Sequence, residues 1–137
     1  MTRSDIKIIS IRPSWCQDES NIERNLGPLV RDFTLPNAGL LAYIPIKDLA
    51  TAIALAALNT TLPGHEVFYI AAPDSAGGHN LAEWVKAKYG EKIPIRDLPF
   101  PDASSLCCDK AVKLLGWKPT LSWRDFLGKN GKLIAKQ

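Results

Sequence analysis

Apolar residues follow two different spacings along this chain, and segments of the two kinds alternate. Residues 6–12 (IKIISIR) are dominated by β-branched side chains, which favour a strand, and Pro13 should end its regular pairing. We expect this segment to be an interior strand. A second strand is predicted for residues 66–72 (EVFYIAA) and a third, shorter one for residues 93–98. Segments with helical spacing separate the three.

The first predicted helix is rich in alanine and follows Asp48. Its apolar side chains recur at helical spacing, at Leu49, Ala52, Ile53, Ala56 and Ala57. The small side chains permit close packing, so this helix should lie flat against a sheet. Asp48 follows the end of an extended segment, where a catalytic carboxylate could lie. We expect a structural role instead, in which Asp48 caps the helix by accepting backbone N–H bonds.

A second helix is predicted for residues 81–89, and both of its ends carry boundary signals. Asn80 precedes it and has capping-box spacing to Glu83, while Gly90 follows it. Trp84 falls on its apolar side and should pack in the core.

Residues 109–126 (DKAVKLLGWKPTLSWRDF) predict a helix, a corner and the start of another helix. Asp109 is expected to cap the first helix, Gly116 to adopt a left-handed C-terminal cap, and Pro119 to prevent continuation. The apolar residues expected to share one side of this helix are Ala111, Val112, Leu114 and Leu115. A further helix should begin near Ser122.

The remaining segments are less regular. Residues 21–26 could form a helical turn or two, which Gly27-Pro28 should break. Residues 36–39 (PNAG) predict a turn, and residues 40–46 a short extended segment. Because helices and strands alternate along the chain, the sequence favours an α/β fold.

Length and composition are those of one globular unit. The chain has 137 residues, 46% of them hydrophobic, which is enough for a core, and we expect residues 1–137 to form a single compact unit. No apolar stretch approaches the roughly 18 residues of a membrane span, and no secretory signal is recognisable, so a cytoplasmic location is expected. The net charge of +3 is spread along the sequence, so neither nucleic acid nor membrane is expected as a partner.

Three cysteines, Cys16, Cys107 and Cys108, match neither an even disulfide framework nor a metal-ligand spacing. We therefore expect no metal site, and we expect the cysteines to be small, partly buried residues in a reducing compartment. A redox-active or nucleophilic thiol is the alternative.

Catalytic motifs are absent, and no catalytic residue is assigned. Gly77-Gly78 lacks the third glycine of a dinucleotide-binding turn. Tyr43 and Lys47 have Tyr-x-x-x-Lys spacing, but Pro45 obstructs the helix on which such a pair would share a face. His65 and His79 follow glycine-containing turns and are expected to be loop residues.

Four segments, in order, resemble the second half of the extended short-chain dehydrogenase/reductases, the NAD-dependent epimerase/dehydratase family. They are IISIRPSW (8–15), YIPIKDLATAIALAAL (43–58), EVFYIAAPD (66–74) and KAVKLLGWKP (110–119). The last is similar to the family's Lys-Ala-x-x-x-Leu-Gly-Trp-x-Pro segment. The resemblance implies incomplete Rossmann-type sheet elements with an alanine-rich helix in residues 1–76, and the small α/β C-terminal lobe in residues 77–137.

The resemblance also implies what the chain could bind. The full-length family uses NAD or NADP for hydride transfer to or from a small-molecule substrate, and the residues matching Pro13, Ser14 and Trp15 flank the nicotinamide. The family's glycine turn and catalytic Tyr-x-x-x-Lys should precede Met1. The chain alone is therefore expected to be inactive and to bind neither cofactor tightly.

The substrate class stays open. Leu41 stands where many nucleotide-sugar members carry a phosphate-binding arginine, so a less charged carbonyl or alcohol is as plausible as a nucleotide sugar. Arg31 and Arg96 are the candidate substrate contacts. The alternative to an enzyme part is a non-enzymatic interaction module, in which the uncovered sheet recruits a partner or forms a homodimer.

Overall fold

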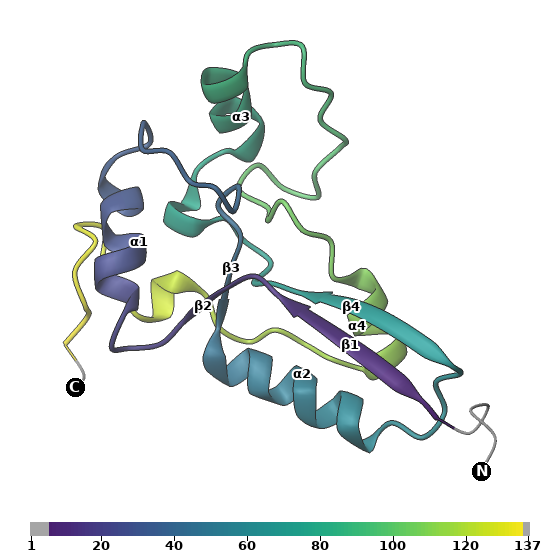
Figure 1. Cartoon of the computed structure of the whole chain (residues 1–137). Coiled ribbons are helices and arrows are strands. Elements are labelled where there is room, and N and C mark those ends of the chain that lie inside the picture. The colour runs from purple at the N-terminus through teal and green to yellow at the C-terminus, as the bar shows by residue number, and fades with distance from the viewer. Residues whose placement is uncertain (1–5, 136–137) are drawn as a thin grey trace.

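The computed structural model describes residues 6–135 and confirms a mixed α/β fold, in which helices and strands alternate from Trp15 to Ile70 and only helical elements follow (Figure 1). In chain order the elements are β1 (Ile8–Pro13), β2 (Trp15–Gln17), α1 (Ile22–Arg31), β3 (Tyr43–Pro45), α2 (Ile46–Leu58), β4 (His65–Ile70), the 3-10 turn η2 (Ala76–Gly78), α3 (Leu81–Tyr89), α4 (Asp109–Leu115) and the 3-10 turn η3 (Trp123–Asp125). No helix among residues 6–135 combines the length and the hydropathy needed to cross a membrane.

The predicted strands at residues 6–12 and 66–72 pair with each other in parallel as β1 and β4. Their register runs from Ile8 opposite His65 to Pro13 opposite Ile70. The prediction of an interior strand was wrong for the described chain, because β1 has β4 as its one neighbour in a two-stranded sheet. After Ser14 the chain continues as β2, which pairs in parallel with β3 in a second small sheet.

Helix α2 lies along the β1–β4 sheet, as its alanine content predicts (Figure 1). Its buried face includes Leu49, Ala52 and Ala56, which form one apolar cluster with Phe68 and Ile70 of β4. The helix begins at Ile46, three residues earlier than predicted. Since Pro45 occupies the N-cap position, Asp48 lies inside the first turn and does not cap the helix.

Helix α1 is longer than predicted. It runs through Gly27-Pro28 to Arg31, although a proline in a helix removes one backbone hydrogen bond. The prediction of a break was wrong because Leu26 and Leu29, on either side of the dipeptide, are both buried in a second apolar cluster. Burial of these side chains outweighs the weakened backbone bonding at Pro28.

Helix α3 confirms its prediction, with Asn80 accepting a hydrogen bond from the Glu83 backbone N–H at 3.2 Å and Gly90 following its last residue. Trp84 is buried in the same cluster as α1, as predicted.

The third predicted strand, residues 93–98, is not formed. Within residues 6–135, residues 94–99 take part in no hydrogen bond, and Ile95 and Leu98 pack by their side chains against the α1–α3 cluster. Prolines at positions 94 and 99 remove two backbone hydrogen-bond donors. Neither small sheet includes this segment, so its strand-forming residues have no strand to pair with.

Two other predicted elements are shorter than expected. Of the extended segment 40–46, only Tyr43–Pro45 is a strand, because Leu40 and Leu41 have positive φ angles of 50° and 63°. The helix expected from Ser122 is the single 3-10 turn η3, with the Ser122 and Asp125 side chains in a reciprocal capping box.

Helix α4 and its C-terminal cap match the prediction, with two corrections. Gly116 is left-handed (φ 66°, ψ 19°), a conformation that other residues adopt at a cost. Cys108, not Asp109, occupies the N-cap position. Val112 and Leu114 are 42% and 40% exposed, so the buried side of α4 is narrower than its four apolar residues suggest.

Candidate functional site

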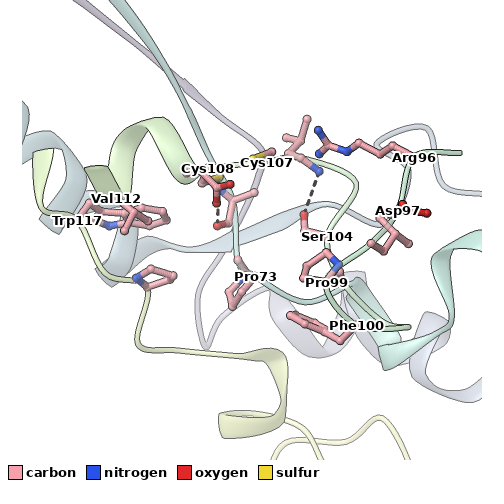
Figure 2. A pocket seen from close by; sticks show the side chains of 17 residues that line it. Pro73, Arg96, Asp97, Pro99, Phe100, Ser104, Cys107, Cys108, Val112 and Trp117 are labelled. Carbon is pink, nitrogen blue, oxygen red and sulfur yellow. Dashed lines mark hydrogen bonds between the residues drawn. The ribbon is translucent and has the colours of Figure 1, made fainter. Parts of the chain in front are cut away.

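A pocket of about 570 Å³ opens where β4 ends, between the segment after β4, the chain before α4 and α4 itself (Figure 2). Its apolar lining residues are Ala71, Ala72, Pro73, Leu98, Pro99, Phe100, Ala103, Leu106, Val112, Trp117 and Pro119. Its polar lining residues are Arg96, Asp97, Ser104, Cys107, Cys108 and Asp109. Ligands of parallel α/β sheets bind beyond the carboxyl ends of the strands, and this pocket lies beyond the carboxyl end of β4. Its volume is in the range of small-molecule sites.

Backbone hydrogen bonds hold the pocket wall to the end of β4. Ser104 donates its backbone N–H to the Pro73 carbonyl at 2.8 Å, and Ser75 donates to the Asp102 carbonyl at 2.7 Å. Asp74 and Ala103 form an isolated antiparallel bridge between the two stretches. The wall at 102–104 is therefore fixed.

The two adjacent cysteines differ in exposure, since Cys107 is exposed and Cys108 is half-buried. The Cys108 Sγ accepts from the Ala71 N–H at 3.3 Å, and burial raises the pKa of this thiol above its usual value. Cys107 is exposed and free at the pocket. Burial of Cys108 favours the neutral thiol, so it is a packing residue rather than a nucleophile.

Ser104 is the most buried polar side chain of the pocket lining, at 6% exposure. Its Oγ accepts the Leu106 backbone N–H at 3.3 Å (dashed in Figure 2). Among the hydrogen bonds of residues 6–135, the Ser104 hydroxyl donates none, so its proton is available to a ligand.

Beside the pocket, Asp74 organises a buried polar network. Tyr43 donates its hydroxyl proton to Asp74 Oδ1 at 2.6 Å, and Ser122 donates to Asp74 Oδ2, also at 2.6 Å. Arg124 bridges Asp74 and Asp102 at 2.6 and 2.7 Å. Burial and the Asp74 charge raise the pKa of Tyr43 far above its usual 10.0. Tyr43 stays protonated as a donor in this network, so it is not poised to act as a base.

Asp48 accepts backbone N–H bonds as predicted, but from a different part of the chain. Its carboxylate accepts from the Thr120 N–H at 2.8 Å, the Leu121 N–H at 2.9 Å and the Thr120 hydroxyl at 2.9 Å. The indole of Trp117 donates to the Asp48 backbone carbonyl at 3.0 Å. With 3% exposure, Asp48 is a structural acceptor out of reach of solvent.

The three residues expected beside nicotinamide lie together at the carboxyl end of β1. Ser14 donates its backbone N–H to the Ile70 carbonyl at 3.0 Å, and Pro13 is paired with Ile70 in the sheet. Trp15 begins β2 and is 40% exposed. None of the three lines the pocket at β4. Contact with a cofactor stays a prediction for all three.

The two candidate substrate-binding arginines lie apart. Arg96 lines the pocket, whereas Arg31 ends α1 and donates to the Asn130 carbonyl at 3.2 Å, away from the pocket. Within the described chain Arg96 has no ion-pair partner. Contact with an anionic substrate stays a prediction for both.

A dinucleotide does not fit the only double-glycine turn of the chain. Gly77 has a positive φ of 81°, but a Cβ placed there would lie 2.7 Å from the Leu29 carbonyl oxygen. The space in front of the turn is filled by α1, and His79 contacts the same Leu29 carbonyl. The turn therefore serves internal packing.

Other candidate groups are separated or already partnered. Tyr43 is in β3 and Lys47 is in α2, so the pair shares no helix face. His65 accepts or donates a bond with Ser10 at 2.8 Å across the β1–β4 sheet. No cluster of three or more His, Cys, Asp or Glu side chains suited to a metal ion occurs in residues 6–135.

No protein-family model matches the chain, and no curated protein is significantly similar to it.

Sequence reasoning missed Ser104, which lies between a predicted strand and a predicted helix with no motif around it. It also missed the role of Asp74 as the shared acceptor for Tyr43, Ser122 and Arg124. The position of Asp74 just beyond the carboxyl end of a predicted parallel strand was the one available signal.

Proposed function

We propose that this chain is the C-terminal substrate-binding part of an NAD(P)-dependent epimerase, dehydratase or reductase of the extended short-chain dehydrogenase type. The observation that carries the proposal is the pocket beyond β4, at the same end of a parallel pair as Pro13 and Ser14 of β1. Two parallel strands with a helix packed along them, and a pocket at their carboxyl ends, is the arrangement that α/β enzymes use for ligands.

The order of elements supports the same proposal. Four elements follow one another in the order expected for the family that the chain resembles. They are the Arg-Pro end of β1, helix α2 after Tyr43–Pro45, strand β4 and the Gly-Trp corner after α4. The closing corner also has a physical role here, because Trp117 is fully buried and reaches from α4 to the backbone of α2.

The chain alone is not a complete catalyst under this proposal. Its 137 residues contain no three-glycine dinucleotide turn, and the Tyr43–Lys47 pair is split between a strand and a helix. Pocket residues bind and orient a substrate, and the cofactor and the general acid come from another part of such an enzyme.

The test compares the chain with a chimera in which the cofactor-binding half of an extended short-chain dehydrogenase precedes Ile6. With NADH or NADPH and a panel of carbonyl compounds, the free chain should show no cofactor oxidation, and the chimera should show turnover. The matched control is the same chimera with the tyrosine of the grafted Tyr-x-x-x-Lys replaced by phenylalanine, which should be inactive. Turnover by the free chain at the rate of the chimera, or a cofactor-binding chimera that reduces nothing, would contradict the proposal.

A second candidate function is a self-associating interaction module. It is favoured by the β1–β4 sheet, which packs against α2 on one face. Within residues 6–135, β1 has no strand on its second edge, and parallel sheets are normally covered on both faces. On the face turned away from α2, Ile8 and Tyr69 are 51% and 47% exposed. We propose a second copy of the chain as the partner that covers this edge.

Solution size distinguishes this candidate from the first. Ile8→Lys should convert a dimer into a monomer, whereas Ile134→Lys should not, since Ile134 has a matching exposure of 50% but lies far from β1 in the sequence and outside the sheet. A wild-type chain that stays monomeric at high concentration would eliminate the self-associating module.

A further inference from the structure

The charges at the pocket beyond β4 do not favour a multiply anionic ligand. Its lining contains one arginine, Arg96, and two aspartates, Asp97 and Asp109. Neither aspartate has an ion-pair partner in the described chain, and the two carboxylates outnumber the single guanidinium in the lining. A phosphate or diphosphate bound here would gain one cation and face two carboxylates.

The rest of the pocket offers apolar surface with two aromatic rings. In Figure 2, Val112 and Trp117 lie at one end, Pro73 lies in the middle, and Phe100 and Ser104 lie toward the other end. Such a surface gains free energy by removing an apolar body from water.

Ser104 supplies a directional polar group in this apolar setting. Its side chain is nine-tenths buried, its Oγ already accepts the Leu106 N–H, and its own proton has no acceptor within residues 6–135. A buried hydroxyl with an unused donor is stabilised by a ligand that provides an acceptor oxygen.

We propose that this pocket binds an uncharged, mainly apolar carbonyl compound, whose carbonyl oxygen accepts a hydrogen bond from Ser104 Oγ. The inference rests on the proposed function in taking the pocket as the substrate site, and it adds the substrate class. An aromatic ketone fits this description, and a nucleotide diphosphate sugar does not.

The first experiment measures binding to the purified full chain by NMR with four probes: acetophenone, ethylbenzene, benzoate and UDP-glucose. Acetophenone should bind most tightly, ethylbenzene more weakly, and the two anions least. Val112→Trp should abolish acetophenone binding by filling the pocket from α4. Leu114→Trp is the matched control, because Leu114 is on the same helix with 40% exposure against 42% for Val112 and does not line the pocket.

The second experiment isolates the hydrogen bond. Ser104→Ala should weaken acetophenone binding about five- to tenfold, as expected for one hydrogen bond, and leave ethylbenzene binding unchanged. Ethylbenzene has the same ring but no acceptor, so its unchanged affinity would show that the variant pocket is intact. Equal loss for both probes would overturn the role of Ser104.

The outcomes separate this inference from the proposed function. If benzoate or UDP-glucose binds more tightly than acetophenone and Val112→Trp abolishes that binding, the substrate class is wrong while the pocket remains a substrate site. If no probe binds in a way that Val112→Trp prevents, both this inference and the assignment of the pocket as the substrate site are overturned.

Discussion

The closing segment, residues 117–127, and the pocket loop, residues 93–100, are both largely irregular, but different forces hold them. The closing segment is fastened by buried carboxylates: Asp48 accepts three hydrogen bonds from it, and Asp74 accepts bonds from Ser122 and Arg124. In the pocket loop, residues 94–99 make no hydrogen bond within the described chain and are placed by side-chain packing alone.

The closing segment serves the fold, and the pocket loop serves the site. Hydrogen bonds to a buried charge are directional and costly to leave unmade, so they impose one geometry. Apolar packing of a loop is less directional, and here it leaves the pocket of about 570 Å³ between the loop and β4. We expect substitutions in the closing segment to change stability and substitutions in the pocket loop to change binding.

The largest effect is expected at Asp48. Asp48→Ala leaves the two backbone N–H groups and the Thr120 hydroxyl, which are part-buried, without their shared carboxylate acceptor, and should lower the free energy of unfolding by about 3 kcal/mol. Asp48→Asn keeps an acceptor oxygen and should cost about 1 kcal/mol. Urea denaturation of both variants measures the two values. If alanine costs no more than asparagine, the carboxylate does not hold the closing segment.

Tyr43→Phe should have the next largest effect. The Tyr43 hydroxyl donates to Asp74 and accepts the Trp123 backbone N–H at 2.7 Å, so its removal leaves two buried groups without this partner. The free energy of unfolding should fall by about 2 kcal/mol. Tyr89→Phe is the control, since Tyr89 is 52% exposed and its ring contact with Trp84 is retained. Equal stability of the two variants would argue against the network.

The stability of the wild type at high pH tests the same network, with Tyr43→Phe as the reference. Tyr43 has a raised pKa when folded, so its contribution to stability is fully present below the usual value of 10.0 and is lost as the pH rises from there toward the folded pKa. The free energy of unfolding should fall more steeply between pH 10 and about 11 in the wild type than in Tyr43→Phe. Parallel curves for the two proteins would show that burial of this phenol is not linked to folding.

The smallest stability effect is expected in the pocket loop. Phe100 is 40% exposed and lines the pocket, so Phe100→Ala should lower the free energy of unfolding by less than about 1 kcal/mol. The same variant should weaken binding of an aromatic ligand to the pocket. A loss of stability as large as that of Asp48→Ala would remove the distinction between the two segments.

Local signals were sufficient for several elements. The β-branched run gave β1, alanine content and periodicity gave α2, and the Asn80 and Gly90 boundaries gave α3. In each of these segments, the residues that favour the local conformation are the same ones that the core buries, so propensity and packing agree.

Local signals failed where tertiary contacts opposed them. Pro28 predicted a break, but the buried leucines on either side kept α1 intact. Residues 93–98 have strand-forming side chains but no neighbouring strand, and a strand is not stable without one. For Ser104, no residue pattern distinguishes a hydroxyl with an unused donor from any other loop serine.

Neighbouring residues are enough to predict the mixed α/β class, the left-handed cap at Gly116 and the lack of a complete dinucleotide turn. What Asp48 and Asp74 bind, and where the pocket lies, depend on tertiary packing. Asp48 meets Thr120 across 72 positions, and Asp74 meets Ser122 across 48. Contacts at such separations depend on how the whole chain packs, which no local pattern specifies.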